Sequence, residues 1–163
     1  MKCLVFSDSH GCVGYMREAL RMHPDAEVVF FLGDGVSDIN HIAAYDIERM
    51  WICVRGNCDF TKIFRESELN KTEDITLLGK KILLTHGDLY NVKFGLDRLK
   101  YLAIERNADI VLFGHTHIPS EEYVSSEKPF YLFNPGSISS PSYSFGIITL
   151  DESGVLFSHG SFA

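Results

Sequence analysis

Five short motifs in the sequence place a glycine beside a side chain that can bind a metal ion. Each motif directly follows an apolar run that predicts a β-strand, and ligand sites in parallel-sheet folds form at the carboxyl ends of strands. Glycine lets the backbone turn tightly or approach an ion closely. We therefore expect the motifs to converge. They are Asp8-Ser9-His10-Gly11, Gly33-Asp34-Gly35, Gly56-Asn57-Cys58-Asp59, His86-Gly87 and Gly114-His115-Thr116-His117.

The metal-binding side chains of these motifs supply nitrogen and oxygen donors without a thiolate, a set that suits divalent ions such as manganese, iron, nickel or zinc. Seven ligands are too many for one ion with an open position, but they suit two ions that share a carboxylate. Two ions at +4 and two carboxylates at −2 leave +2, which favours an anionic substrate, and paired ions promote in-line attack at phosphorus. The candidate ligands are Asp8, His10, Asp34, Asn57, His86, His115 and His117.

Each motif alone has a plainer interpretation. Asp8 and His10 can be surface residues, and His115 and His117 can be solvated histidines at a strand end. In extended backbone, residues two apart point the same way, so His115 and His117 can instead face one site. The presence of all five motifs in one chain, each after a strand, favours the metal site.

Apolar runs and helical spacing alternate in the first two-thirds of the chain. Apolar runs predict strands at residues 4–6, 28–32, 51–54 and 109–113. The continuous run at 28–32 indicates a strand buried on both faces, and 109–113 is expected to be another buried strand. Helical spacing predicts helices at 14–22, from a Ser37 cap to about Tyr45, and at 94–106 with Leu96, Leu99, Ala103 and Ile104 on one face. A hairpin is expected from 75 to 85, with Gly79-Lys80 at its turn.

The end of the chain changes to antiparallel hairpins. Strands at 123–124 and 130–133 flank one polar turn, and strands at 145–150 and 155–157 flank another. Parallel strands with crossover helices, followed by hairpins, predict an α/β fold in which two facing mixed β-sheets are flanked by helices. A length of 163 residues without a linker or repeat predicts a single domain, residues 1–163.

The composition excludes several classes of protein. Apolar residues make up 45% and charged residues 23%, as in ordinary globular proteins. A net charge of −7 without a basic run argues against stable binding of nucleic acid. We expect no membrane span and no signal peptide. The four cysteines form no CxxC motif, which favours a reducing, cytoplasmic location.

Taken in order, the five motifs resemble the signature of the calcineurin-like metallophosphoesterases. The small size, Gly-Asn-Cys-Asp at 56–59 and the later Asn134-Pro135-Gly136-Ser137 look like the YfcE-type phosphodiesterase subfamily of bacteria and archaea. The resemblance extends from Asp8 to about Ser137. It implies a metallophosphoesterase-type α/β sandwich, in agreement with the pattern of strands and helices.

The resemblance also implies a role for each candidate ligand. A hydroxide shared by two divalent ions is the nucleophile; we expect manganese, with nickel, iron or zinc as alternatives. Asn57 and Asp59 are the expected catalytic residues, although Asp59 can instead orient the Asn57 loop or cap a turn or helix. The implied ligands are Asp8, His10 and His117 for the first ion, Asn57, His86 and His115 for the second, and Asp34 as the bridge.

These features predict a dinuclear metal-dependent phosphoesterase, specifically a phosphodiesterase that acts on a small phosphate ester. A phosphomonoesterase and a nucleotide pyrophosphohydrolase share the metal core and stay open as alternatives. A non-catalytic scaffold of the same fold, as in a eukaryotic retromer subunit, is disfavoured because every ligand position is filled. Aromatic residues near the C-terminal hairpins hint at a homo-oligomer.

Cys58 departs from the family, because many relatives have a histidine there that is thought to protonate the leaving group or stabilise the phosphoryl oxygens. A thiol with a pKa of about 8.5 is a weaker acid than imidazolium, so poor leaving groups should react slowly. We favour Cys58 as a small filler over a redox or nucleophilic cysteine. Residues 134–137 either support the histidine loop from behind or form a plain turn, and Asp88 is a candidate rim group.

Overall fold

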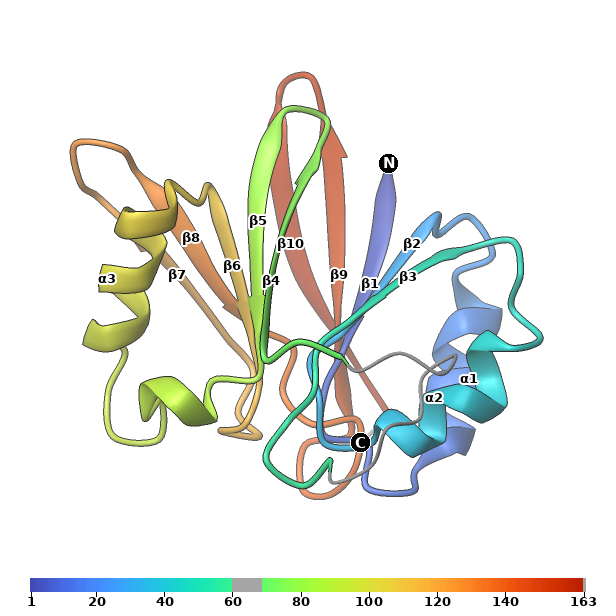
Figure 1. The fold of residues 1–163 in the computed structure, drawn as a ribbon. Helices are drawn as coiled ribbons and strands as arrows, with labels where there is room; N and C mark the ends of the chain where they lie inside the picture. The colour runs from blue at the N-terminus through green and yellow to red at the C-terminus, as the bar shows by residue number, and fades with distance from the viewer. Residues whose placement is uncertain (60–68, 163) are drawn as a thin grey trace.

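The computed structural model describes residues 1–59 and 69–162, which form two five-stranded sheets and three α-helices. The elements in chain order are β1 (Lys2–Phe6), α1 (Val13–Met22), β2 (Val28–Phe31), α2 (Val36–Ala43), β3 (Met50–Cys53), β4 (Thr72–Leu77), β5 (Lys80–Thr85), the 3-10 helix η1 (Asp88–Tyr90), α3 (Asp97–Arg106), β6 (Ile110–Phe113), β7 (Ser120–Val124), β8 (Phe130–Asn134), β9 (Ser144–Asp151) and β10 (Gly154–Ser161). Figure 1 shows the two sheets facing each other, with α1 and α2 on one side and α3 on the other.

Parallel pairing brings the carboxyl ends of the central strands to one end of the sandwich. The first sheet has the order β10-β9-β1-β2-β3 and the second the order β4-β5-β6-β8-β7. Strands β1, β2 and β3 pair in parallel, as do β5, β6 and β8. Strands β9, β10, β4 and β7 pair antiparallel with their neighbours. The expected fold class, two facing mixed β-sheets flanked by helices, is confirmed.

Three apolar layers form the core, one between the sheets and one under the helices on each side. Side chains alternate along a strand, so Phe30 enters the layer between the sheets while Phe31 packs under α1 and α2. Phe113 packs beneath α3 together with Leu99. Burial on both faces explains why β1, β2 and β6 have continuous apolar sequences.

The three expected hairpins are confirmed. Strands β4 and β5 are joined by Leu78 and Gly79, whose φ angles of 45° and 76° suit a type I′ turn. The turn lies one residue earlier than Gly79-Lys80, because Lys80 already belongs to β5. Strand β7 pairs with β8, and β9 pairs with β10.

The expected start of the second helix was wrong. Helix α2 begins at Val36 after Gly35, so Ser37 lies inside the helix and cannot cap it. The capping acceptor comes instead from Asp59, whose Oδ1 accepts hydrogen bonds from the Gly35 and Val36 N–H groups at 2.9 Å each. A distant loop therefore supplies the cap that the local sequence lacks.

The third helix is shorter than expected. Gly95, with a φ angle of 146°, interrupts the pattern, so α3 begins at Asp97 and leaves Phe94 93% exposed. The buried face of α3 includes Leu102, whereas Ile104 is exposed, contrary to expectation.

Within the described part of the chain, no helix has the length and apolar character needed to cross a membrane.

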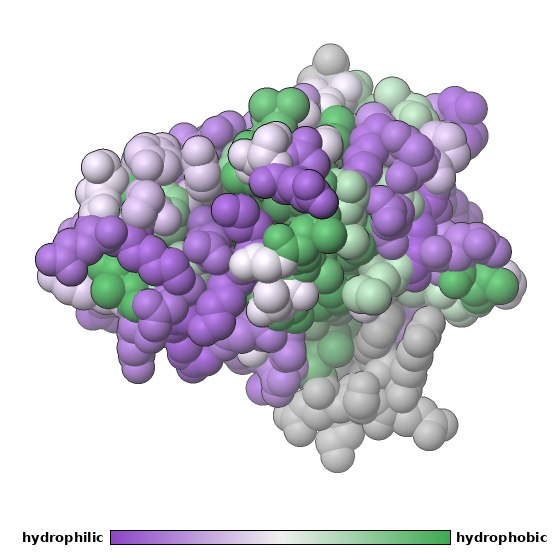
Figure 2. Space-filling model, turned by 90° about the horizontal axis from the view of Figure 1, so that it is seen from above, coloured by the Kyte–Doolittle hydropathy of each residue, from purple (hydrophilic) through white to green (hydrophobic). Residues whose placement is uncertain are grey.

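The end of the molecule seen in Figure 2 lies opposite the carboxyl ends of β1, β2 and β3. Hydrophobic surface runs along its middle between hydrophilic flanks. Met1, Leu77 and Val155 pack against the apolar layer between the sheets and are only partly buried. The polar side chains of the five motifs gather at the other end.

Candidate metal centre

Two groups of candidate ligands form where the two sheets meet at the carboxyl ends of their strands. In each group the ligand atoms lie within 4.8 Å of one another. The first group combines the loop after β1 with the loop after β6, and the second combines the loop after β2 with the loops after β5 and β6. The first group contains Asp8, His10 and His117, and the second contains Asp34, His86 and His115.

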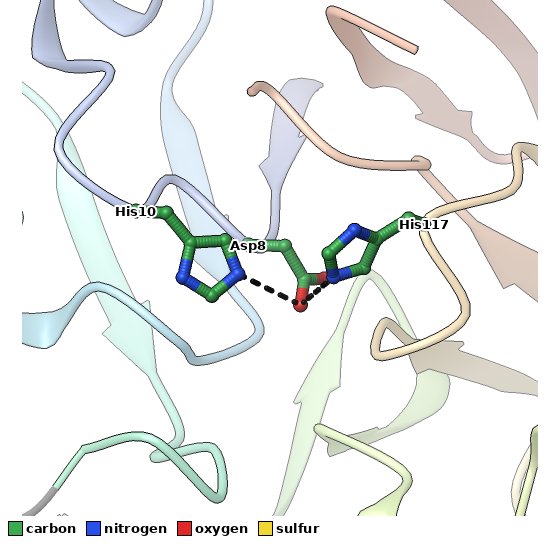
Figure 3. Close-up of side chains that lie close together, drawn as sticks. All are labelled: Asp8, His10 and His117. Carbon is green, nitrogen blue, oxygen red and sulfur yellow. Dashed lines mark ion pairs between the residues drawn. The ribbon is translucent and has the colours of Figure 1, made fainter. Parts of the chain in front are cut away.

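The Asp8 carboxylate is the centre of the first group (Figure 3). Its Oδ2 accepts hydrogen bonds from Ser7 Oγ at 2.5 Å and from the His115 N–H at 3.1 Å. Its Oδ1 is buried and accepts no hydrogen bond from the described residues. The nearest ring nitrogens are His117 Nε2 at 3.0 Å and His10 Nε2 at 3.9 Å. A buried carboxylate oxygen facing imidazole nitrogens fits a divalent cation.

In the second group, His86 is oriented by its own backbone surroundings. Its Nδ1 lies 2.8 Å from the Leu32 carbonyl oxygen, to which it can donate, and this leaves Nε2 for the site. Nε2 lies 3.3 Å from Asp34 Oδ2 and 3.1 Å from His115 Nδ1.

His86 also connects the two groups, because its Nε2 lies 3.9 Å from Asp8 Oδ1. The buried ring of His86 is therefore close to carboxylates of both groups.

The electrostatics of the buried groups favour charged carboxylates. Burial opposes ionisation of Asp8, but His117, His86 and Ser7 more than offset it and hold the pKa of Asp8 below its ordinary value. Asp34 is also buried, yet His86 and the Cys58 N–H hold its pKa well below the usual range. Both side chains are therefore anionic at neutral pH, the form in which carboxylates bind metals.

The two histidine rings of the second group shift in opposite directions. Burial opposes charge on His86, yet Asp34 and Asp8 raise its pKa. Burial lowers the pKa of His115, and the charges of His86 and Lys93 lower it further. His115 is thereby kept in the neutral form that can bind an ion.

Five of the seven candidate ligands have left-handed backbone conformations. L-residues rarely adopt positive φ, and such conformations persist where surrounding contacts impose them, often at functional sites. The extended backbone expected at His115 and His117 is not found, because both residues are left-handed. Each of them joins one of the two neighbouring donor groups. The φ angles are 55° at Asp8, 41° at His10, 58° at Asp34, 66° at His115 and 62° at His117.

Glycine permits the close packing of two of these loops. A Cβ atom on Gly33 would lie 2.4 Å from the Gly56 nitrogen, and one on Gly56 would lie 2.0 Å from Asp34 Oδ1. Any side chain at either position would push the Asn57 loop away from Asp34. The glycines of the motifs thus serve loop contact as well as turning.

Asp59 fastens the loops around Asp34 and Asn57. Its carboxylate oxygens accept hydrogen bonds from four backbone N–H groups, which are those of Asp34, Gly35, Val36 and Gly56 at 2.8–2.9 Å. The two interpretations from the sequence, loop orientation and helix capping, are both correct. These contacts describe a positioning residue, and a catalytic role for Asp59 stays a prediction.

Asn57 and Cys58 lie at the exposed edge of the second group. The Asn57 amide donates to Cys58 Sγ at 3.2 Å, and the Cys58 N–H donates to Asp34 Oδ1 at 2.8 Å. Burial and the neighbouring Asp34 raise the pKa of the Cys58 thiol. The raised pKa keeps Cys58 protonated, which argues against a thiolate nucleophile.

Two supporting residues, Ser139 and Asp38, were not singled out from the sequence, and Ser137 was named there as a support of the histidine loop rather than of Asp8. Ser137 Oγ and Ser139 Oγ donate to the Asp8 carbonyl at 2.8 and 2.9 Å. Asp38 Oδ2 accepts from Ser9 Oγ at 2.6 Å and from the Gly11 N–H at 2.8 Å. Their partners lie far away in the sequence, so local patterns carry no signal for these contacts.

Asn134 supports the histidine loop, in agreement with one of the two interpretations of residues 134–137. Its Nδ2 donates to the Gly114 carbonyl and to Thr116 Oγ1 at 3.0 Å each. His159 is exposed, and its Nε2 lies 2.8 Å from the Asn134 carbonyl oxygen.

Two curated relatives match most of the chain. The probable metallophosphoesterase YsnB of Bacillus subtilis is 33% identical over 157 residues, covering 93% of this chain and 86% of that protein. The phosphodiesterase YfcE of Escherichia coli is 28% identical over 185 residues, covering 96% of this chain and 91% of that protein.

Solved structures share the fold. A phosphoesterase predicted in Streptococcus pneumoniae superposes with a TM-score of 0.77 at 29% identity, over 98% of this chain and 88% of that one. Vps29 of Entamoeba histolytica, solved in complex with Zn²⁺, superposes with a TM-score of 0.73 at 21% identity over the whole of both chains, and at that identity it shows the fold alone.

The model of the calcineurin-like phosphoesterase superfamily domain matches residues 1–153. This match spans every candidate ligand and every strand except β10. By sequence, by fold and by the placement of these donors, the chain belongs to the calcineurin-like phosphoesterase superfamily.

Proposed function

We propose that this protein is a dinuclear metal-dependent phosphodiesterase. The observation that carries the proposal is the pair of donor groups joined at His86, with the buried Oδ1 of Asp8 facing the ring nitrogens. The coarser function follows from the family, whose members are hydrolases that act on phosphate esters. The dinuclear centre and the preference for diesters are the parts that we propose.

The proposed ligands divide between two ions. Two divalent ions bound here would activate water and neutralise the charge of the phosphoryl group. Asp34, between the Cys58 N–H and His86 Nε2, is the proposed bridge. The first ion would bind to Asp8, His10 and His117, and the second to Asn57, His86 and His115.

The burial of the ligands indicates which side of the site is open to substrate. Asp8, Asp34 and His86 are buried and form its floor, whereas the side chains of His10 and His117 are 38% and 30% exposed. A phosphate ester therefore approaches from the side of the exposed histidines. Cys58, exposed beside Asp34, keeps its proton and is a weak donor to a leaving group there.

The preference for diesters is supported by the relative YfcE, which is a phosphodiesterase. Monoesterase and nucleotide pyrophosphohydrolase activities use the same donors and remain the alternatives. Specificity in such folds comes from loops, and we expect it here from residues 60–72, 88–93 and 119–122. Residues 60–68 lie outside the described part of the chain.

We propose manganese as the native metal, with nickel, iron or zinc as alternatives suited to the same donors. The four cysteines are free, which supports the proposed cytoplasmic location. The substrate is a small phosphate ester, and the homo-oligomer stays a prediction.

A protein-binding scaffold is the second candidate, because Vps29 shares this fold. The filled ligand set supports the enzyme instead.

The test is to remove metal from the protein, add Mn²⁺ and assay bis-p-nitrophenyl phosphate against p-nitrophenyl phosphate. We expect two ions per chain and faster turnover of the diester. Tight binding of both ions without turnover of either ester would favour the scaffold.

A further inference from the structure

Lys71 joins the loops that carry two of the proposed ligands, Asn57 and His86. Its Nζ donates to the Gly56 carbonyl at 2.8 Å and to Asp88 Oδ2 at 2.9 Å. Gly56 directly precedes Asn57, and Asp88 follows His86 by two residues. The side chains of Lys71 and Asp88 are only 22% and 16% exposed, so the connection is largely shielded from water.

The backbone around Asn57 is fastened on both sides, whereas the contact given for its side chain among residues 1–59 and 69–162 is a weak one. The Asn57 amide contacts the sulfur of Cys58, a weak acceptor, and the residue is exposed. The position of this ligand is thus set through the backbone of its loop. Besides the Lys71 bond, three hydrogen bonds hold that backbone: the Arg55 N–H donates to the Asn70 carbonyl at 3.0 Å, the Gly56 N–H to Asp59 Oδ2 at 2.8 Å and the Cys58 N–H to Asp34 Oδ1 at 2.8 Å.

We propose that Lys71 is a positioning residue that fixes the Asn57 loop against the His86 loop and thereby sets the affinity of the second ion. The inference rests on the dinuclear centre proposed above. The charges of Lys71 and Asp88 offset each other, so Lys71 acts by fixing the position of the Asn57 loop rather than by changing the electrostatic potential at the site. Groups that orient metal ligands typically change metal affinity by about 10- to 100-fold.

Stability and positioning are separated by four variants. Lys71→Met removes the bond to Gly56 but leaves the Asp88 carboxylate, whose Oδ1 already has no partner among the described residues, without a counterion. The double variant Lys71→Met/Asp88→Asn removes that charge as well. Asp88→Asn alone keeps the Lys71 bond to Gly56, and Lys71→Arg keeps a donor at this position.

Lys128 offers a matched control. Its Nζ donates to the Asn107 carbonyl at 2.7 Å and lies 3.8 Å from Asp109 Oδ1, so it also combines a carbonyl with a carboxylate. These partners lie before β6, at the opposite end of that strand from His115. Lys128→Met therefore removes an equivalent connection away from the proposed ligands.

The experiment titrates metal-free protein with Mn²⁺, follows binding by calorimetry and records the electron paramagnetic resonance spectrum. We expect Lys71→Met and the double variant to bind the second ion about 10- to 100-fold more weakly, with the first unchanged. Their spectra should show isolated Mn²⁺ at concentrations where wild-type protein shows a coupled pair. Lys71→Arg and Asp88→Asn should stay within about threefold of wild type, and Lys128→Met should match it.

Two results would overturn the inference in distinguishable ways. If the wild-type protein binds one ion, the dinuclear centre fails, and the role of Lys71 fails with it. If the wild-type protein binds two ions and the folded double variant binds both with unchanged affinity, only the role of Lys71 fails. The melting temperature of the double variant, compared with that of Lys128→Met, establishes that it is folded.

Discussion

The two donor groups differ in how firmly the chain holds them. In the first, only Asp8 is buried, and His10 and His117 are partly exposed. In the second, Asp34 and His86 are buried, and His115 is partly exposed. A buried ligand has already lost its rotamer freedom on folding, while an exposed one loses it when the ion binds. More of the ligand side chains in the second group are therefore fixed before an ion binds, whereas more of those in the first group become ordered when the ion binds.

The two groups also differ in how many hydrogen bonds a neighbouring aspartate makes to their loops. Asp38 holds the loop before His10 through two hydrogen bonds, to Ser9 and Gly11. Asp59 holds the loops of Asp34 and Asn57 through four bonds to backbone N–H groups. Each group thus has one aspartate outside the ligand set that fixes its loops, and the aspartate of the second group makes twice as many hydrogen bonds as that of the first.

The largest expected effect comes from the residue that we place in both sites. Asp34→Asn removes a charge shared by two ions, so both should bind at least about 100-fold more weakly and turnover of diesters should be lost. Metal content per chain, measured by elemental analysis after dialysis, checks the stoichiometry. Loss of a single ion would show that Asp34 is not the bridge.

His117→Ala should affect one group only. His117 lies 3.0 Å from Asp8 Oδ1 and belongs to the open first group, so the first ion should bind at least about tenfold more weakly. The second ion should keep its affinity, which a titration with two resolved binding steps can measure. An equal loss from both sites would contradict the division into two groups.

The two supporting aspartates should differ in their effect on stability. Asp59→Ala leaves four backbone donors without their acceptor, and we expect the free energy of unfolding to fall by about 2–4 kcal/mol. Asp38→Ala removes two bonds and should cost about 1–2 kcal/mol. Urea denaturation of the metal-free variants measures both. Equal losses would mean that the second group is not the more firmly held.

The placement of the site could be predicted because its signals are local. An apolar run, a glycine and a polar donor describe a strand end, and parallel pairing brings strand ends together. Asp8, Asp34 and His86 follow this rule directly. The two-sheet fold could be predicted for the same reason, since hairpins and buried strands have local patterns, as the β4–β5 hairpin shows.

The details that failed depend on contacts between distant residues. The loop that carries the left-handed His115 and His117 is held by the Asp8 and Asn134 side chains, which come from distant parts of the sequence. The cap of α2 comes from Asp59, more than twenty positions after the helix begins. No pattern within a short window of sequence contains such information.

The smallest expected effect, and the most informative about chemistry, is that of Cys58. The thiol accepts from the Asn57 amide, and burial and the neighbouring Asp34 raise its pKa, so it keeps its proton. In-line displacement needs a nucleophile and charge neutralisation, both of which the ions supply. Cys58→Ala should therefore retain most of the activity on an activated diester.

The dependence on the leaving group tests this interpretation further. A general acid matters only when the departing oxygen is basic, and it then contributes about 10²- to 10⁴-fold. Rates of the wild-type protein should therefore fall steeply across a series of aryl diesters of rising leaving-group pKa. Cys58→His introduces a donor with a pKa of about 6.5 and should flatten that slope. If Cys58→Ala abolishes turnover of the activated diester while both ions stay bound, the thiol takes part in catalysis and the assignment of all chemistry to the metal centre is wrong.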